Sequence, residues 1–258
     1  MRDTRGRFEL PGPAVWALRL AVLVALIAGW QAASGTLLPV FYISSPAKVL
    51  EVLQRWLADG SIWKHVWATV LVLFSGYAIG AAIGIAAGLW LGLNPRTERL
   101  LQPFIAALFG LPKMALLPLL VIVFGIGFAS KVVLVASVVV FLLLFATLSG
   151  VRDIDRDMVE SLRLMGATEG ELTRKVRMPA ILPWVYTGLR TSIGYALTTT
   201  VVSEALQSNR GLGFLIEHAA VSFNAAGVFA AVVVLLVLSM AIMLPLGALE
   251  ARMRPVRL

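Results

Sequence analysis

The sequence predicts an all-α polytopic membrane protein with six transmembrane helices in a single domain. Of its 258 residues, 59% are hydrophobic and only 14% are charged, whereas soluble domains carry about 25% charged residues. The apolar residues fall into six long runs, each close to or above the ~20 residues that a helix needs to cross a bilayer. A chain of this length cannot hide six such runs in one soluble core. The runs are 14–34, 66–92, 101–124, 131–149, 183–206 and 225–248.

The placement of Arg and Lys predicts which helix ends face the cytoplasm. Basic residues concentrate in the N-terminal tail (1–13), the connection at 93–100, the segment 151–182 and the C-terminal tail (249–258). Connections rich in Arg and Lys stay in the cytoplasm. We therefore expect both tails and the 151–182 loop to be cytoplasmic, around one membrane domain spanning 14–248. The net charge of +8 then needs no nucleic acid to explain it.

The first run follows a basic tail but lacks a clear small-residue cleavage site, so we expect a retained span rather than a cleaved signal. The outer segment behind it predicts a short amphipathic helix at the outer surface. Ser45 can cap this helix, and Pro46 suits its first position.

Four glycines recur every four residues in the second run. They are Gly76, Gly80, Gly84 and Gly88. This spacing puts them on one stripe of a helix, where the missing side chains let a neighbouring backbone come close. We predict helix packing as their role, with a direct functional role as the alternative.

Two prolines interrupt the third run, in the stretch LPKMALLPLL. Pro112 and Pro118 each remove a backbone donor and bend a helix, and the freed carbonyls are tolerated mainly beside protein or a water-filled cavity. Lys113 lies between them and is expected to snorkel, to pair within the protein or to line a cavity. Pro112, Lys113 and Met114 are therefore candidates for a translocation pathway.

The fifth run is rich in hydroxyl groups and carries one acid, Glu204. Hydroxyls cost little in a membrane because they can bond to backbone carbonyls, whereas an ionisable group is expensive there. Glu204 is either a structural anchor paired with a neighbour or part of a solute pathway, together with Thr199 and Ser203. Arg190, nearer the inner end, is expected to snorkel or to pair.

Residues for catalysis are scarce. The chain has no cysteine and two histidines, which lie far apart without a carboxylate at ligand spacing, so we expect no metal site and no catalytic centre. The stretch GIGFASKV resembles a phosphate-binding loop only superficially. Ser130 stands where a glycine is needed, and Val132 stands where Ser or Thr would hold Mg²⁺. We expect this chain itself to bind no cofactor.

A charged island, ESLRLMGATEGELTRKVRMP at 160–179, lies between two apolar runs. A first helix is expected to run to about Met165. Asp153, Asp155 or Asp157 can cap its start. Gly166 can supply the left-handed residue that closes it.

Thr168 and Glu171 have the spacing of a capping box and predict a second short helix. Pro179 and Pro183 are expected to stop it at the membrane. The first helix presents apolar residues at a spacing of three, namely Val159, Leu162 and Met165. Such a helix suits docking into a partner's groove, and an ordinary membrane-surface helix is the alternative.

The island resembles the EAA loop in the membrane-spanning subunits of binding-protein-dependent ABC importers. That pattern is Glu-Ala-Ala, three residues, Gly, nine residues and Ile-x-Leu-Pro. The match here is carried by Glu160, Gly166 and the run Val176-Arg177-Met178-Pro179. Ser161 and Leu162 replace the two alanines. The stretch LPKMALLPLLVIVFGIG, Glu204 and GLG at 211–213 are similar to the branch that imports nitrate, taurine, aliphatic sulfonates and related small organic anions.

The resemblance implies an ABC importer permease fold in the bacterial cytoplasmic (inner) membrane. Two copies would form the pathway for a small organic or inorganic anion. Two ABC ATPase subunits would bind ATP and Mg²⁺ and each receive one EAA loop, while an extracytoplasmic solute-binding protein would deliver substrate. Arg156 and Arg163 would be available to pair with the ATPase. The coupling residues implied are Arg156, Glu160, Ser161, Leu162, Arg163, Gly166, Ala167, Pro179 and Pro183.

Other functions stay open at this level. Related branches that carry pyrimidine precursors, riboflavin or aromatic acids also resemble this sequence. An ion-coupled secondary transporter would usually show two related halves and membrane-embedded acids, but no internal repeat is evident and Glu204 is the one acid expected within a span. A membrane anchor without transport is disfavoured by the prolines and polar residues of the third and fifth runs.

Overall fold

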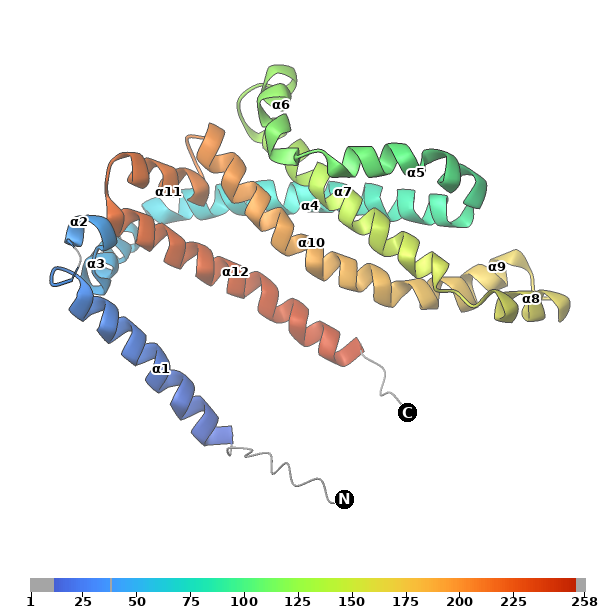
Figure 1. Cartoon of the computed structure of the whole chain (residues 1–258), viewed down its shortest axis with the longest axis horizontal. Helices are drawn as coiled ribbons and strands as arrows, with labels where there is room; N and C mark the ends of the chain where they lie inside the picture. Colours follow the sequence, from blue (N-terminus) through green and yellow to red (C-terminus); the bar gives the residue numbers. More distant parts are fainter. Residues whose placement is uncertain (1–11, 38, 254–258) are drawn as a thin grey trace.

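The computed structural model describes residues 12–37 and 39–253, nearly all of them helical (Figure 1). The elements are α1 (Gly12–Ala33), α2 (Val40–Ile43), α3 (Pro46–Ala58), α4 (Ser61–Leu93), α5 (Pro95–Gly110), the 3₁₀ turn η1 (Lys113–Leu116), α6 (Leu117–Phe124), α7 (Phe128–Arg152), α8 (Arg156–Leu164), α9 (Glu169–Leu172), the π-helical turn η2 (Thr173–Arg177), α10 (Met178–Gln207), α11 (Leu212–Val221) and α12 (Ala225–Met253). Most of the predicted N-terminal tail and the end of the C-terminal tail lie outside the described residues.

The predicted all-α membrane fold is confirmed. Four helices are long and apolar enough to cross a membrane, namely α1, α4, α7 and α12. A fifth candidate span is α5 followed by η1 and α6, which is broken by a bend of 82°. The run predicted at 183–206 lies within α10, which is 30 residues long but is not among these candidate spans, because its polar side chains lower its mean hydropathy. Each of the six predicted runs therefore corresponds to one helix or, for the third run, to the two helices on either side of the bend.

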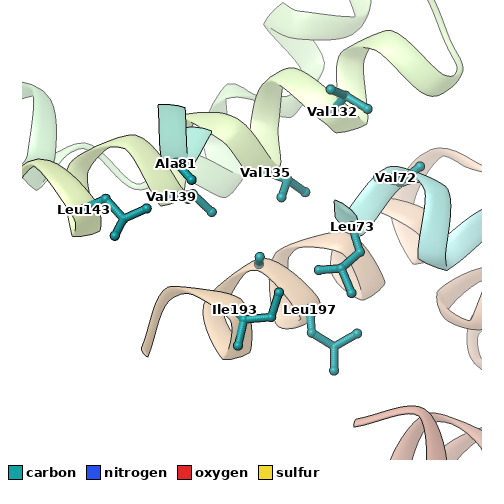
Figure 2. Packing of buried hydrophobic residues seen from close by; sticks show 10 residues of the cluster. Val72, Leu73, Ala81, Val132, Val135, Val139, Leu143, Ile193 and Leu197 are labelled. Atoms are coloured by element: carbon teal, nitrogen blue, oxygen red, sulfur yellow. The ribbon is translucent and has the colours of Figure 1, made fainter. Parts of the chain in front are cut away.

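The core of the protein lies where α4, α7 and α10 pack together. Figure 2 shows side chains from the three helices converging, with Leu73 from α4, Val135 and Val139 from α7, and Ile193 and Leu197 from α10. At one end of this core lie α2, α3 and α11, and at the other end α8 and α9 project beyond it (Figure 1). These five short helices therefore lie at two opposite ends of the core.

The glycine stripe of α4 lies directly against α7. A methyl group built on Gly76, Gly80, Gly84 or Gly88 would come within 2.7 Å of an α7 atom. Gly92, one turn further on, meets Val151 in the same way. The two backbones are in contact along this whole stripe, which only residues without a side chain permit.

The outer segment folds as the sequence predicts. Ser45 caps α3 by accepting a hydrogen bond from the Lys48 N–H at 3.4 Å, and Pro46 occupies the first helical position. The indole N–H of Trp30 in α1 donates to the carbonyl of Ile43 at 3.1 Å. These bonds tie the end of α1 to the segment that leads into α3.

The bend in the third span occurs at Leu111 and Pro112, between α5 and η1. Lys113 pairs within the protein here, because its ammonium donates to the carbonyls of Leu108 (2.6 Å), Phe109 (3.0 Å) and Leu111 (3.0 Å). Its Nζ also lies 4.7 Å from the centre of the Phe141 ring in α7. The lysine thus satisfies carbonyls that the broken helix leaves free and holds the bend against α7.

Candidate functional site

The segment between α7 and α10 forms a built loop, which we call the coupling loop (residues 153–177). Of the three candidate caps, Asp155 opens α8. It accepts hydrogen bonds from the N–H groups of Asp157 (2.9 Å) and Met158 (3.2 Å). Gly166 follows the helix with φ of +91°, a left-handed conformation that glycine adopts without cost. The predicted helix and glycine turn are confirmed.

The predicted capping box of the second helix is also confirmed. The Glu171 N–H donates to Thr168 Oγ1 (3.3 Å), and the Thr168 N–H donates to Glu171 Oε2 (3.1 Å). That backbone N–H, together with the ammonium of Lys175, lowers the pKa of Glu171 to about 2. Glu171 therefore stays ionised well below neutral pH, and its carboxylate keeps accepting from the Thr168 N–H and the Lys175 ammonium.

The prediction that Pro179 and Pro183 stop the second helix is wrong. The chain runs from α9 through η2 into α10, with Pro179 in the first turn of α10 and Pro183 inside it. The Met178 N–H bonds to the Thr173 carbonyl in the wider π-helical turn. This turn precedes Pro179, which has no N–H to donate, so the helix passes the proline without ending. The coupling loop is joined to α10 by continuous helix.

Ion pairs lock the two halves of the coupling loop together across Gly166. Glu169 pairs with Arg163 from α8 and, at 3.1 Å, with Arg177 from η2. The hydrogen bond from Arg163 is the largest cause of the lowered pKa of Glu169. The guanidinium of Arg163 is thus engaged within the loop in this conformation, and its pairing with an ATPase stays a prediction.

The coupling residues predicted on α8 and in the turn after it differ in exposure. Glu160 and Ser161 are exposed, whereas Leu162 and Ala167 are half-buried. Leu164 and Met165 expose 85% and 83% of their surface. Sequence reasoning missed Leu164, although its place just before the Met165–Gly166 turn was a usable signal. The side chain of Arg156 lies outside the described residues.

The base of the coupling loop is attached to two other helices, which the sequence did not reveal. Arg152, at the end of α7, pairs with Glu98 in α5. The next residue, Asp153, accepts a hydrogen bond from the Trp184 indole of α10 at 3.1 Å. A methyl on Gly150 would lie 2.9 Å from Trp184 Cβ, so α7 and α10 touch here. The base of the loop is therefore in contact with both α5 and α10.

A buried polar cluster lies at the other end of α10, around Glu204. Its Oε2 accepts hydrogen bonds from the Thr69 hydroxyl of α4 (2.9 Å) and the Gly213 N–H of α11 (3.1 Å), while Oε1 has no hydrogen-bond partner among the described residues. Thr69 in turn accepts from the Leu212 N–H at 2.9 Å. Glu204 is fully buried, so of its two predicted roles this geometry matches the structural anchor.

A second polar link lies beside this cluster. Lys131 of α7, which is also buried, donates to Ser208 Oγ at 2.9 Å. His65 of α4 lies with its Nδ1 3.2 Å from both the N and the O atoms of Gly211. The loop between α10 and α11 is thereby held to α4 and α7.

The six candidate pathway residues are not brought together. Pro112, Lys113 and Met114 lie at the bend of the third span, partly or fully exposed, while Thr199, Ser203 and Glu204 are buried inside α10's packing interface. The last three face no open space in this conformation. Their role in a pathway stays a prediction.

Known proteins resemble this chain in sequence. The sequence profile of the family described as "Binding-protein-dependent transport system inner membrane component" matches residues 80–255. The taurine transport system permease protein TauC of Escherichia coli (strain K12) is 31% identical over 245 residues, which cover 92% of this chain and 87% of TauC. The riboflavin transport system permease protein RibX of Chloroflexus aurantiacus is 34% identical over 249 residues, covering 95% and 90% of the two chains.

A solved structure has the same fold. A chain of the MetNI methionine ABC transporter in an inward-facing conformation superposes with a TM-score of 0.65 over 74% of this chain and 95% of that one. Its sequence identity of 20% supports the shared fold alone.

Proposed function

We propose a function from one premise: the chain belongs to the family of binding-protein-dependent transport system inner membrane components, and is thus a multi-pass inner membrane subunit of an ABC importer. Two copies form the translocation pathway. Each presents its coupling loop to one of two cytoplasmic ATPase subunits, which bind ATP and Mg²⁺. This chain is not itself catalytic, and a solute-binding protein outside the membrane delivers the substrate. Both tails face the cytoplasm.

The observation that carries this proposal is the construction of the coupling loop. It projects beyond the membrane core (Figure 1), and its most exposed large apolar side chains are Leu164 and Met165. Exposed apolar groups on a short, rigid helix suit the groove of a protein partner. The coupling loop continues as helix into α10 and is attached to α5. A displacement of α8 by a partner would therefore be transmitted directly to the membrane domain.

For the substrate we propose a small organic or inorganic anion such as taurine, an aliphatic sulfonate or nitrate. TauC and two aliphatic sulfonate permeases among the relatives support this class. Riboflavin or a pyrimidine precursor is the second candidate, favoured by the likeness to RibX and to a formylaminopyrimidine permease. Calorimetry of the purified solute-binding protein with taurine, an alkanesulfonate and riboflavin distinguishes the two.

Uptake measured in liposomes tests the class of transporter. The complex of this chain with its ATPase and solute-binding protein is expected to accumulate radiolabelled ligand of the binding protein when ATP is enclosed with the ATPase. Uptake driven by a sodium or proton gradient in the absence of ATP would instead establish a secondary transporter.

Replacing Gly166 by valine is expected to uncouple ATP hydrolysis from transport. A left-handed conformation costs an L-residue about 1–2 kcal/mol, so the turn between α8 and α9 should open. Substrate moved per ATP hydrolysed should fall about fivefold or more, within the usual range of coupling between sites. Gly170→Val is the matched control, since a methyl on either glycine would have no atom within 4 Å and Gly170 has no positive φ. Normal coupling in Gly166→Val would show that the turn transmits no force.

Breaking the pair between Glu98 and Arg152 is expected to weaken coupling more mildly. The Arg152 side chain is 55% exposed, and such pairs contribute about 0.2–1 kcal/mol, or a change of about 1.4- to fivefold. Glu98→Arg should lower transport per ATP by that factor, and the exchange Glu98→Arg with Arg152→Glu should restore it. Failure of the exchange to restore coupling, with both proteins folded, would remove α5 from the coupling route.

A further inference from the structure

The middle of α10 exposes only polar side chains. From Tyr186 to Ala205, the exposed residues are Thr187, Arg190, Thr191, Tyr195 and Thr198. We call these five residues the polar row. Thr187, Thr191, Tyr195 and Thr198 follow one another at three or four positions, so they share one face of the helix. The opposite face, with Ile193, Ala196 and Leu197, is buried in the core.

Two other long helices, α4 and α12, expose a different kind of surface. Along residues 66–92 of α4 every exposed side chain is apolar, including Phe74 and Ile83, and the same holds for 225–247 of α12 beyond its first turn, including Leu236 and Val237. Apolar side chains are what a surface facing lipid tails requires, whereas polar groups in a span usually face the interior of a bundle or a water-filled cavity. The polar row therefore does not fit a lipid-facing surface.

The hydroxyls of the row are arranged to meet water or solute. Thr187 donates to the Pro183 carbonyl at 2.9 Å and Thr198 donates to the Gly194 carbonyl at 3.1 Å. Each oxygen keeps its lone pairs for a group outside the helix. Tyr195 is 56% exposed, and its hydroxyl can both donate and accept. The row thus offers donors and acceptors along the middle of α10.

We propose that the polar row lines the aqueous pathway through which a polar solute passes between two copies of the chain. The inference rests on the proposed function and deepens it, because it moves the pathway of α10 from the buried Thr199, Ser203 and Glu204 to the exposed face of the helix. Adjacent residues Thr198 and Thr199 mark the boundary, the first exposed and the second 3% exposed. The solute class that this face suits is small, polar and rich in hydrogen-bonding groups.

The test is cysteine accessibility in the assembled complex, because the chain has no cysteine of its own. Thr191→Cys, Tyr195→Cys and Thr198→Cys are treated in liposomes with a charged, membrane-impermeant methanethiosulfonate reagent. Ile83→Cys and Val237→Cys are the controls, since they are 52% and 61% exposed on apolar faces. The thiolate that reacts forms where water reaches the sulfur. We expect the row to react about tenfold or more faster than the controls, a difference of ~1.4 kcal/mol.

The possible outcomes separate this inference from the function on which it rests. The inference is overturned if the row reacts no faster than the controls. It is also overturned if all three positions are protected and form disulfides between copies, because the row would then be a dry contact of the dimer. Fast reaction that changes when ATP is added to the ATPase supports it. Uptake driven by an ion gradient would contradict the proposed ATP-driven importer. A reactive row would in that case still show that a water-filled pathway runs along α10.

Discussion

Gly84→Val is expected to destabilise the protein by about 3 kcal/mol or more, at the upper end of the cost of overpacking a core. A methyl at this position would lie 2.5 Å from the Val140 carbonyl oxygen and 3.1 Å from its Cα. Both atoms belong to the backbone of α7, which cannot rotate away as a side chain can. The two helices must therefore separate. The measurement is thermal unfolding in detergent, where the midpoint should fall by roughly 2–4 °C per kcal/mol.

The control for Gly84→Val lies on the same helix. Ala82 and Ala86 are exposed, so Ala82→Val and Ala86→Val introduce the same β-branched residue on the apolar outer face. These variants should unfold within a few degrees of the unaltered chain. If Gly84→Val unfolds at the same temperature as these controls, the stripe does not hold α4 against α7.

Features decided by neighbouring residues could be predicted from the sequence. Ser45, Gly166 and the pair Thr168–Glu171 act within one turn of their own helix ends, so residue type and spacing identify them. The lengths of the apolar runs likewise place the spans. Pro179 shows the limit of such signals, because whether a proline ends a helix depends on the turn before it, and here a π-helical turn accommodates it.

Features decided by distant residues could not be predicted. Thr69 and Glu204 are 135 positions apart, and nothing local marks them as partners. Thr198 and Thr199 are identical in type and adjacent, yet only packing against α4 and α7 decides which of them is buried. The pair between Arg163 and Glu169 crosses the glycine turn, and only the fold brings these two side chains together.

Glu204→Ala is expected to cost about 3–5 kcal/mol, the usual loss when a large buried side chain is cut back to alanine. The Gly213 N–H would lose its acceptor, at about 1–3 kcal/mol for a buried group left unpaired, whereas the Thr69 hydroxyl could still donate to the His65 carbonyl at 3.2 Å. The surroundings cannot collapse to compensate, since Gly211 and Gly213 already pack their backbones against this side chain. Thermal unfolding and hydrogen exchange at residues 208–213 are the measurements, with the loop expected to lose protection first.

Glu204→Gln separates the anchor role from a role in the solute pathway. An amide oxygen can accept the same two hydrogen bonds, and the side chain keeps its shape, so we expect less than half of the destabilisation seen with alanine. Transport by Glu204→Gln should then track the amount of folded complex. A variant that folds and binds its ATPase normally but no longer transports would show that the negative charge itself acts on the solute. Equal destabilisation by Gln and Ala would instead mean that the charge, balanced by the nearby Lys131, holds α10 to α7.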